Sequence, residues 1–207
     1  MLRIGRLLGE SEFPRPTGTR LELPVAIALS TGMRRGEILG LRWGDFDQGL
    51  TVAQVRRSLQ ITKGGLVFEP PKTARSRRSV ALPRFLGPYL ERGREDQGLR
   101  RARAPERWQD LHLVVDRGDG GGWNPDTFSR DWPRFLHRAG LPPVRFHDLR
   151  HAHATFMLAK GIHPKVVSER LGHSSVGITL DTYSHVLPSM QSEAARAFDE
   201  LFDPALS

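Results

Sequence analysis

Hydrophobic residues recur at helical spacing through most of the chain and predict a mainly helical protein. In each such stretch the apolar side chains fall three or four positions apart, which gathers them on one face of a helix. The predicted helical stretches are residues 21–31, 33–43, 124–140, 147–161, 163–172, 174–186 and 192–202. Residues 83–107 predict a further helix that runs into an arginine-rich loop.

Helix boundaries are marked by capping residues and glycines. Asn124 or Asp126 is expected to cap the helix that starts there, because a short polar side chain can accept hydrogen bonds from the first backbone amides. Gly140, Gly161 and Gly172 follow apolar helical runs and are expected to end them, because glycine readily adopts the left-handed conformation.

A short region between the helices predicts β-structure. Residues 51–62, 66–70 and 77–83 are rich in β-branched and alternating side chains, and the sequence KGG at 63–65 is typical of a hairpin turn. Residues 111–116 predict another short strand. The fold class is therefore mixed α+β, mainly α-helical, with a small antiparallel sheet or hairpin.

Length and composition favour one domain. A chain of 207 residues with 38% hydrophobic content can bury one core and is short for two. We expect residues 1–20 to be a tail or the remnant of a linker, 21–188 to be the folded domain, and 189–207 to be an acidic helix or tail.

The charge distribution indicates a polyanionic partner. The chain has 31 Lys and Arg against 23 Asp and Glu, and its isoelectric point is near 10.8. Nucleic acid is the first candidate partner and an anionic membrane surface the second. Because no apolar run approaches 18 residues and the start lacks a leader-like apolar segment, a membrane role is disfavoured. The absence of cysteine excludes thiolate chemistry and fits a cytoplasmic protein.

Tyr183 is one of two tyrosines and a candidate nucleophile. A free phenol has a pKa of about 10, so ionising it at pH 7 costs roughly 4 kcal/mol. Attack on a phosphodiester would need nearby cations or a base to offset that cost. Two arginines from separate segments, such as Arg34 and Arg150, could clamp one phosphate, while a histidine and a lysine move protons. Such a scheme requires no metal and no cofactor.

Five motifs carry a resemblance to a known family. In order they are TGMRRGE, PPKTARSRRSV, HDLRHAHAT, LGHSS and TLDTYSHV. Together they resemble the catalytic domain of the tyrosine recombinases, the phage integrase family. The resemblance implies that family's catalytic fold and a metal-free, ATP-independent DNA strand exchange, in which the tyrosine forms a 3′-phosphotyrosyl link and releases a 5′-hydroxyl.

The resemblance also implies a role for particular residues. Arg34 and Arg150 correspond to the phosphate clamp, and Tyr183 to the nucleophile. Lys72 resembles the general acid of the hairpin, His147 the histidine that handles a proton, and His173 a hydrogen-bond donor to the transition state. Glu37 resembles the acid that orients Arg34, at the i,i+3 spacing of an ion pair.

For other polar residues near these motifs the sequence leaves more than one role possible or assigns none. Lys63 competes with Lys72 but lies in the predicted turn, where a lysine is usually solvated. Asp148 is expected either to cap its own helix or to pair with an arginine. The candidates for contacts with the DNA backbone are Arg35, Arg75, Arg77 and Arg78, and the histidines without an assigned role are His151, His153 and His185.

Three other functions are compatible with parts of this sequence. HDLRH mimics a zinc-hydrolase motif, with His147 and His151 as ligands and Glu169 as a third, but Arg150 would place a positive charge near the metal. A catalytically weak or inactive DNA-binding fragment of a mobile-element integrase is the second. The third is the related chemistry of a type IB topoisomerase, which relaxes supercoiled DNA without site preference.

The resemblance also suggests partners. We expect double-stranded DNA, a homo-oligomer assembled on that DNA through the acidic tail helix, and no membrane. Accessory DNA-bending proteins stay unspecified. Members of the family usually carry a helical DNA-clamp domain before the catalytic domain, and we expect this chain to lack it, because TGMRRGE lies so close to its start.

Overall fold

The computed structural model describes residues 20–71, 77–183 and 198–199, and this part of the chain is mainly helical. Its longer helices fall close to the predicted stretches. They are α2 (Glu22–Thr31), α3 (Arg35–Gly40), α4 (Gly87–Arg103), α5 (Pro125–Arg138), α6 (Asp148–Ala159), α7 (Pro164–Leu171) and α8 (Val176–Tyr183). The tail helix predicted over 192–202 lies almost entirely outside the described residues.

The capping signals act as the sequence predicts. Asn124 Oδ1 accepts hydrogen bonds from the amides of Asp126 and Thr127 at 2.8 and 3.2 Å, which fixes the start of α5. α7 ends at Gly172, whose φ of +69° is in the left-handed region that glycine adopts without strain. The remaining predicted stops, Gly140 and Gly161, also have positive φ, one residue beyond the helix caps.

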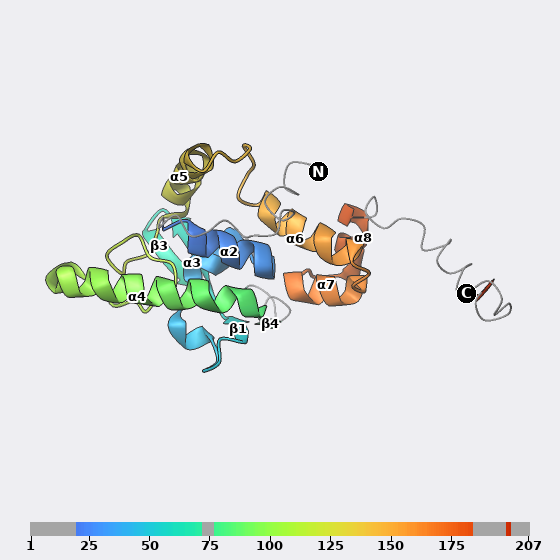
Figure 1. The fold of residues 1–207 in the computed structure, drawn as a ribbon, viewed down its shortest axis with the longest axis horizontal. Coiled ribbons are helices and arrows are strands. Elements are labelled where there is room, and N and C mark those ends of the chain that lie inside the picture. The colour runs from blue at the N-terminus through green and yellow to red at the C-terminus, as the bar shows by residue number, and fades with distance from the viewer. Residues whose placement is uncertain (1–19, 72–76, 184–197, 200–207) are drawn as a thin grey trace.

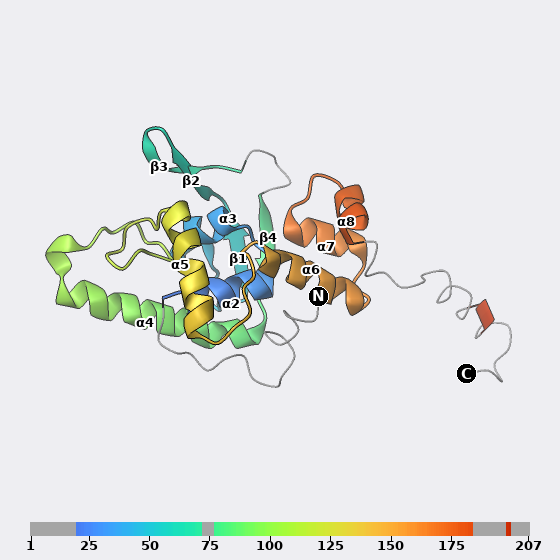
Figure 2. The same cartoon turned by 90° about the horizontal axis from the view of Figure 1, so that it is seen from above.

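The β-structure consists of two separate antiparallel pairs rather than one sheet. β1 (Val52–Val55) pairs with β4 (Arg78–Ala81), and β2 (Ser58–Thr62) pairs with β3 (Gly65–Glu69) through the predicted turn. The expected continuous strand over 51–62 is therefore divided into β1 and β2. The β2–β3 hairpin projects from the body of the protein (Figure 2).

The strand predicted at residues 111–116 is wrong. This segment makes only isolated bridges, Leu113 with Arg42 and Asp116 with Gly122, and no ladder. Its apolar residues Val114 and Val115 are nevertheless buried in the core. A buried apolar run of this length does not by itself distinguish a strand from an extended core segment.

Two hydrophobic clusters organise the described residues. The larger one packs α2, α3, α5 and the β1–β4 pair around fully buried side chains such as Ile27, Ile38 and Phe128. The smaller one lies between α6, α7 and α8 and includes Tyr183. Figure 1 shows these three helices together at one end of the protein, beside α2, which packs on α6. No helix in the described ranges is long and apolar enough to span a bilayer.

Candidate active site

Tyr183 lies at the C-terminal end of α8, with its side chain directed into the smaller cluster. Only 3% of its surface is exposed, and its hydroxyl lies 2.8 Å from Nδ1 of His151 on α6. Burial raises the pKa of the phenol above its usual value of 10, and the positive charge of Arg150 opposes that rise. The candidate nucleophile is therefore a neutral phenol in contact with an imidazole.

Arg150 brings a buried positive charge next to this tyrosine. Its Nη1 donates to the carbonyl of Gly32 at 2.6 Å, whereas Nη2 is buried and has no hydrogen-bond partner. Burial, followed by repulsion from Arg34, lowers the pKa of Arg150 to about 10, so it stays charged at neutral pH. A buried charged donor without a partner is costly, and an anion at this position would relieve that cost.

Glu37 connects two further arginines to the site. Its carboxylate accepts from Arg34 Nη1 at 3.0 Å and from Arg78 Nη1 and Nη2 at 3.0 and 2.9 Å. Burial alone would raise the pKa of Glu37, but the hydrogen bonds and charges of Arg78 and then Arg34 outweigh it, so the pKa lies below 4.5. The predicted i,i+3 pair between Arg34 and Glu37 is present.

Two glycines in the left-handed conformation supply carbonyl groups that hold the arginines. Gly32, with φ of +66°, accepts from Arg150, and Gly172, with φ of +69°, accepts from Arg34 Nη2 at 3.3 Å. A Cβ atom at Gly172 would lie 2.8 Å from Nη1 of Arg78. The sequence motifs TGMR and LGH therefore place a glycine where the backbone must approach a guanidinium group.

Two predicted histidines complete the electrostatic environment. His173 Nδ1 lies 2.8 Å from the hydroxyl of Thr179 on α8, and burial with the charges of Arg150 and Arg34 lowers its pKa to about 4. His147 begins α6, and burial followed by the charges of His151 and Arg150 lowers its pKa. Both imidazoles are therefore neutral at pH 7, which fits a site whose fixed charge is already positive.

His151 is a site residue that the sequence left without a role. Among the side chains that the structure describes, His151 is the one that forms a hydrogen bond with the hydroxyl of the candidate nucleophile. A signal was present in the sequence, because His147 and His151 are four residues apart and therefore share a face of α6. The structure places their rings 4.9 Å apart between centroids and nearly perpendicular.

The remaining predicted residues have different placements. Lys72 and Arg75 lie outside the described residues. Arg77 is exposed and, with Arg56, lines a hollow of about 600 Å³ next to that segment. Arg78 is instead buried by its ion pair with Glu37, in which both side chains are 6% exposed. Arg35 donates to the carbonyl of Pro125 and the hydroxyl of Ser129, which ties α3 to α5.

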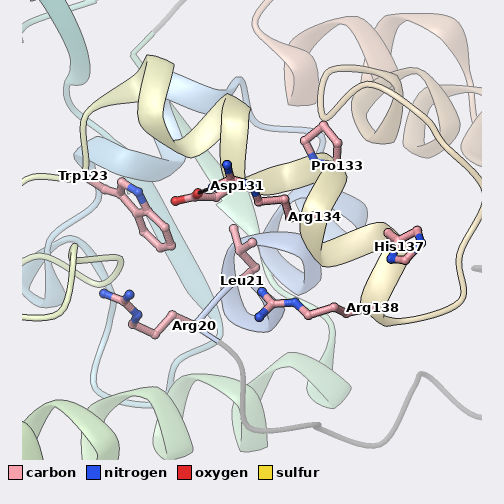
Figure 3. A pocket seen from close by; sticks show the side chains of 8 residues that line it. All are labelled: Arg20, Leu21, Trp123, Asp131, Pro133, Arg134, His137 and Arg138. Carbon is pink, nitrogen blue, oxygen red and sulfur yellow. Dashed lines mark ion pairs between the residues drawn. The ribbon is translucent and has the colours of Figure 1, made fainter.

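Within the described ranges, no three His, Asp or Glu side chains are grouped to hold a metal ion. Glu169, the third ligand of the zinc alternative, pairs with Lys165 at 3.1 Å. A larger hollow, of about 720 Å³, lies elsewhere, between α5 and the residues preceding α2 (Figure 3). Arg134 and Asp131 form an ion pair of 3.5 Å on its rim, and none of the candidate site residues lines it.

The fold is that of a tyrosine recombinase catalytic domain. Residues 3–190 match the model of the phage integrase family. The chain belongs to that family. The five sequence motifs, from TGMRRGE to TLDTYSHV, all lie within the matched residues.

Two curated relatives are identical to the chain at about a third of the aligned positions. A tyrosine recombinase XerC-like protein of Caldanaerobacter subterraneus is 34% identical over 197 residues, covering 89% of this chain and 50% of the relative. The ICEBs1 integrase of Bacillus subtilis is 34% identical over 182 residues, covering 84% and 47%. The chain thus spans about half the length of these relatives.

Solved structures show the same fold. The Tn1549 transposon integrase, determined in complex with circular intermediate DNA, superposes with a TM-score of 0.73 at 20% identity, covering 89% of this chain and 61% of that one. The XerA recombinase gives a TM-score of 0.59 at 22% identity, covering 91% and 60%. The mainly α-helical recombinase fold predicted from the sequence is confirmed.

Proposed function

We propose that this chain cleaves and rejoins double-stranded DNA site-specifically, through a covalent bond between Tyr183 and a 3′-phosphate. The observation that carries this proposal is the electrostatic interaction of Tyr183 with the buried Arg150, whose Nη2 has no hydrogen-bond partner. A scissile phosphate would supply the missing acceptor and place phosphorus next to the phenol. Family membership and relatives named as integrases and recombinases point the same way.

In this proposal Arg34 and Arg150 stabilise the charge that builds up on the non-bridging phosphate oxygens. Two guanidinium groups pair with Glu37, and the charge of a third, Arg150, interacts with the same carboxylate. The site therefore carries a positive excess that matches the dianionic transition state. Glu37 leaves the outer part of Arg34 available, since that side chain is 42% exposed. Glu37 thus orients Arg34 from the buried side of the guanidinium group, and the exposed side of that group contacts the phosphate.

Two further residues act on protons and on phosphate oxygens. If the Thr179 hydroxyl donates to Nδ1 of His173, then Nε2 of that histidine carries the hydrogen and can donate to the phosphate. Lys72, from the segment between β3 and β4, protonates the departing 5′-oxygen. Arg75 and Arg77 remain proposed contacts to the DNA backbone, and the exposed hollow beside Arg77 adds Arg56 to that surface.

We also propose that the protein assembles as a homo-oligomer on DNA. Exposed apolar residues on α6, α7 and α8, among them Phe156, Val166 and Ile178, support a contact between subunits. Sedimentation of the chain with a duplex that it cleaves should show more than one protein per DNA. Monomers alone at saturating protein would refute this part of the proposal.

The cleavage activity can be tested by covalent trapping. The chain is incubated in EDTA with a pool of duplexes that carry randomised sequence and a nick, so that the strand released by cleavage diffuses away and the covalent complex accumulates. A protein–DNA product that survives SDS is expected. Salt-sensitive binding without such a product would favour a DNA-binding fragment, whereas activity lost in EDTA would favour the zinc alternative. Relaxation of plasmid without site preference would favour topoisomerase chemistry.

A further inference from the structure

Tyr183 and two histidines of α6 form a contact series. His151 Nδ1 lies 2.8 Å from Tyr183 Oη, with the two ring centroids 5.8 Å apart. His147 contacts the ring of His151, at an interplanar angle of 85°, rather than the tyrosine hydroxyl. The histidine that the family resemblance assigns to proton handling is therefore one step removed from the phenol.

We propose that His151 Nδ1 is the group that accepts the proton of Tyr183 during cleavage, and that His147 positions His151. This inference rests on the proposed function of Tyr183 as the nucleophile. A general base must lie within hydrogen-bond reach of the proton that it removes, and His151 meets this requirement. His147, packed against the ring of His151, restricts its rotation.

Cleavage transfers two protons and exchanges one bond to phosphorus for another. The O–H bond of Tyr183 breaks as its oxygen forms a bond to phosphorus, and the proton passes to Nδ1 of His151, which becomes an imidazolium. The bond from phosphorus to the 5′-oxygen breaks with its electron pair. That oxygen takes a proton from the lysine ammonium proposed for Lys72, and the reverse transfers accompany rejoining.

The surroundings of His151 keep its imidazole available as a base. Burial lowers its pKa below 6.5, Asp148 opposes this, and Arg150 and Arg145 lower it further. The titratable and charged groups that face it from α6, α8 and the neighbouring segments are His147, Asp148, Arg150, Arg145, His173 and Tyr183. The neutral base therefore predominates at pH 7, and cleavage by the wild type should gain no rate above that pH from His151.

The test compares His151→Asn with the matched change His147→Asn. An asparagine at 151 can place its side-chain oxygen near the position of Nδ1, so it can accept a hydrogen bond from Tyr183 but cannot take up the proton. The sequence of the trapped product is determined, and duplexes of that sequence are synthesised in two forms. The bridging atom between phosphorus and the departing 5′ carbon is oxygen in one form and sulfur in the other. Sulfur needs no general acid, so it restores cleavage to a variant such as Lys72→Ala but not to one that lacks the base.

We expect His151→Asn to slow covalent complex formation by about 10²-fold or more at pH 7 with either leaving atom, while DNA binding is retained. This deficit should shrink by about tenfold for each unit of higher pH, as hydroxide replaces the imidazole. His147→Asn should slow the reaction by about tenfold. The inference is overturned if His151→Asn cleaves within about threefold of wild type, if sulfur restores its rate, or if His147→Asn has the larger deficit.

A second measurement needs neither a variant nor cleavage. Nitrogen NMR of the imidazoles in the wild-type chain reports which ring nitrogen carries hydrogen at pH 7. The inference requires an unprotonated Nδ1 on His151, and a hydrogen on that atom would overturn it. Because this result does not depend on DNA, it separates the inference from the proposed function, which fails if the wild type forms no covalent product.

Discussion

Glu37 and Arg78 form a bidentate ion pair in the interior, in which Nη1 donates to Oε1 at 3.0 Å and Nη2 donates to Oε2 at 2.9 Å. The pair joins β4 to α3. Arg78 Nε also donates to the carbonyl of Arg170 at 2.6 Å, which extends the connection to α7. One carboxylate therefore positions Arg34 and links the strand that follows the Lys72 segment to the helices of the site.

Replacing Glu37 with glutamine should destabilise the protein and slow DNA cleavage. The change removes the negative charge that pairs with Arg34 and with the buried side chain of Arg78, so the free energy of unfolding should fall by about 3 kcal/mol. Urea denaturation measures the loss. The control is Asp131→Asn, which breaks the more exposed pair with Arg134 and should cost less than about 1 kcal/mol. Equal losses in the two variants would contradict this role of Glu37.

Gly172→Ala tests the close approach between the LGH motif and the arginines. A methyl group there would suffer both the positive φ and a 2.8 Å contact with Arg78. The control Gly161→Ala has a similar φ of +74° but no atom within 4 Å of the added carbon, so it should cost only about 1 kcal/mol. Gly172→Ala should melt at a lower temperature than Gly161→Ala and cleave DNA more slowly. Matching behaviour of the two variants would show that the contact with Arg78 is unimportant.

His153 should make the protein sensitive to mild acid. Its Nδ1 lies 2.8 Å from the carbonyl of Leu29, Arg170 donates to its Nε2, and burial lowers its pKa to about 4. The unfolded chain takes up a proton below about pH 6.5, whereas the folded chain does so only near pH 4. Stability contributed by the neutral ring is therefore complete above pH 6.5 and falls by up to about 3 kcal/mol as the pH drops to 4.

The measurement for His153 is the unfolding free energy as a function of pH. His153→Leu removes the titrating group and should lose stability at pH 7.5, where two hydrogen bonds disappear, but its further loss between pH 6.5 and 4 should be smaller than that of the wild type. The same decline in both proteins would assign the acid sensitivity to other groups.

Helical periodicity and capping predicted most of the elements from the sequence. The start of α5 at Asn124 and the end of α7 at Gly172 follow from local chemistry, so a sequence contains their signals. The division of residues 51–62 into β1 and β2 and the loss of a strand at 111–116 depend on which segments become neighbours. That information is not local, so periodicity cannot supply it.

The candidate site shows the same distinction. The family motifs identified Arg34, Arg150 and Tyr183, which the structure brings together electrostatically. Arg77 and Arg78 are adjacent, so strand alternation sends them to opposite faces, yet only the fold shows that Arg78 is the one that meets Glu37. The spacing of His147 and His151 was visible but was compatible with a metal site, and the contact with Tyr183 was needed to interpret it.

The most direct test of the central claim is to locate the residue bonded to DNA. Wild type, Tyr89→Phe and Tyr183→Phe are each incubated with the nicked duplex pool, digested with nuclease and trypsin, and analysed by mass spectrometry. Tyr89 is the matched control, as the only other tyrosine in the chain. The account predicts a nucleotide on the peptide that contains Tyr183 in wild type and Tyr89→Phe, and none in Tyr183→Phe. A nucleotide on any other residue, or no adduct in the wild type, would contradict it.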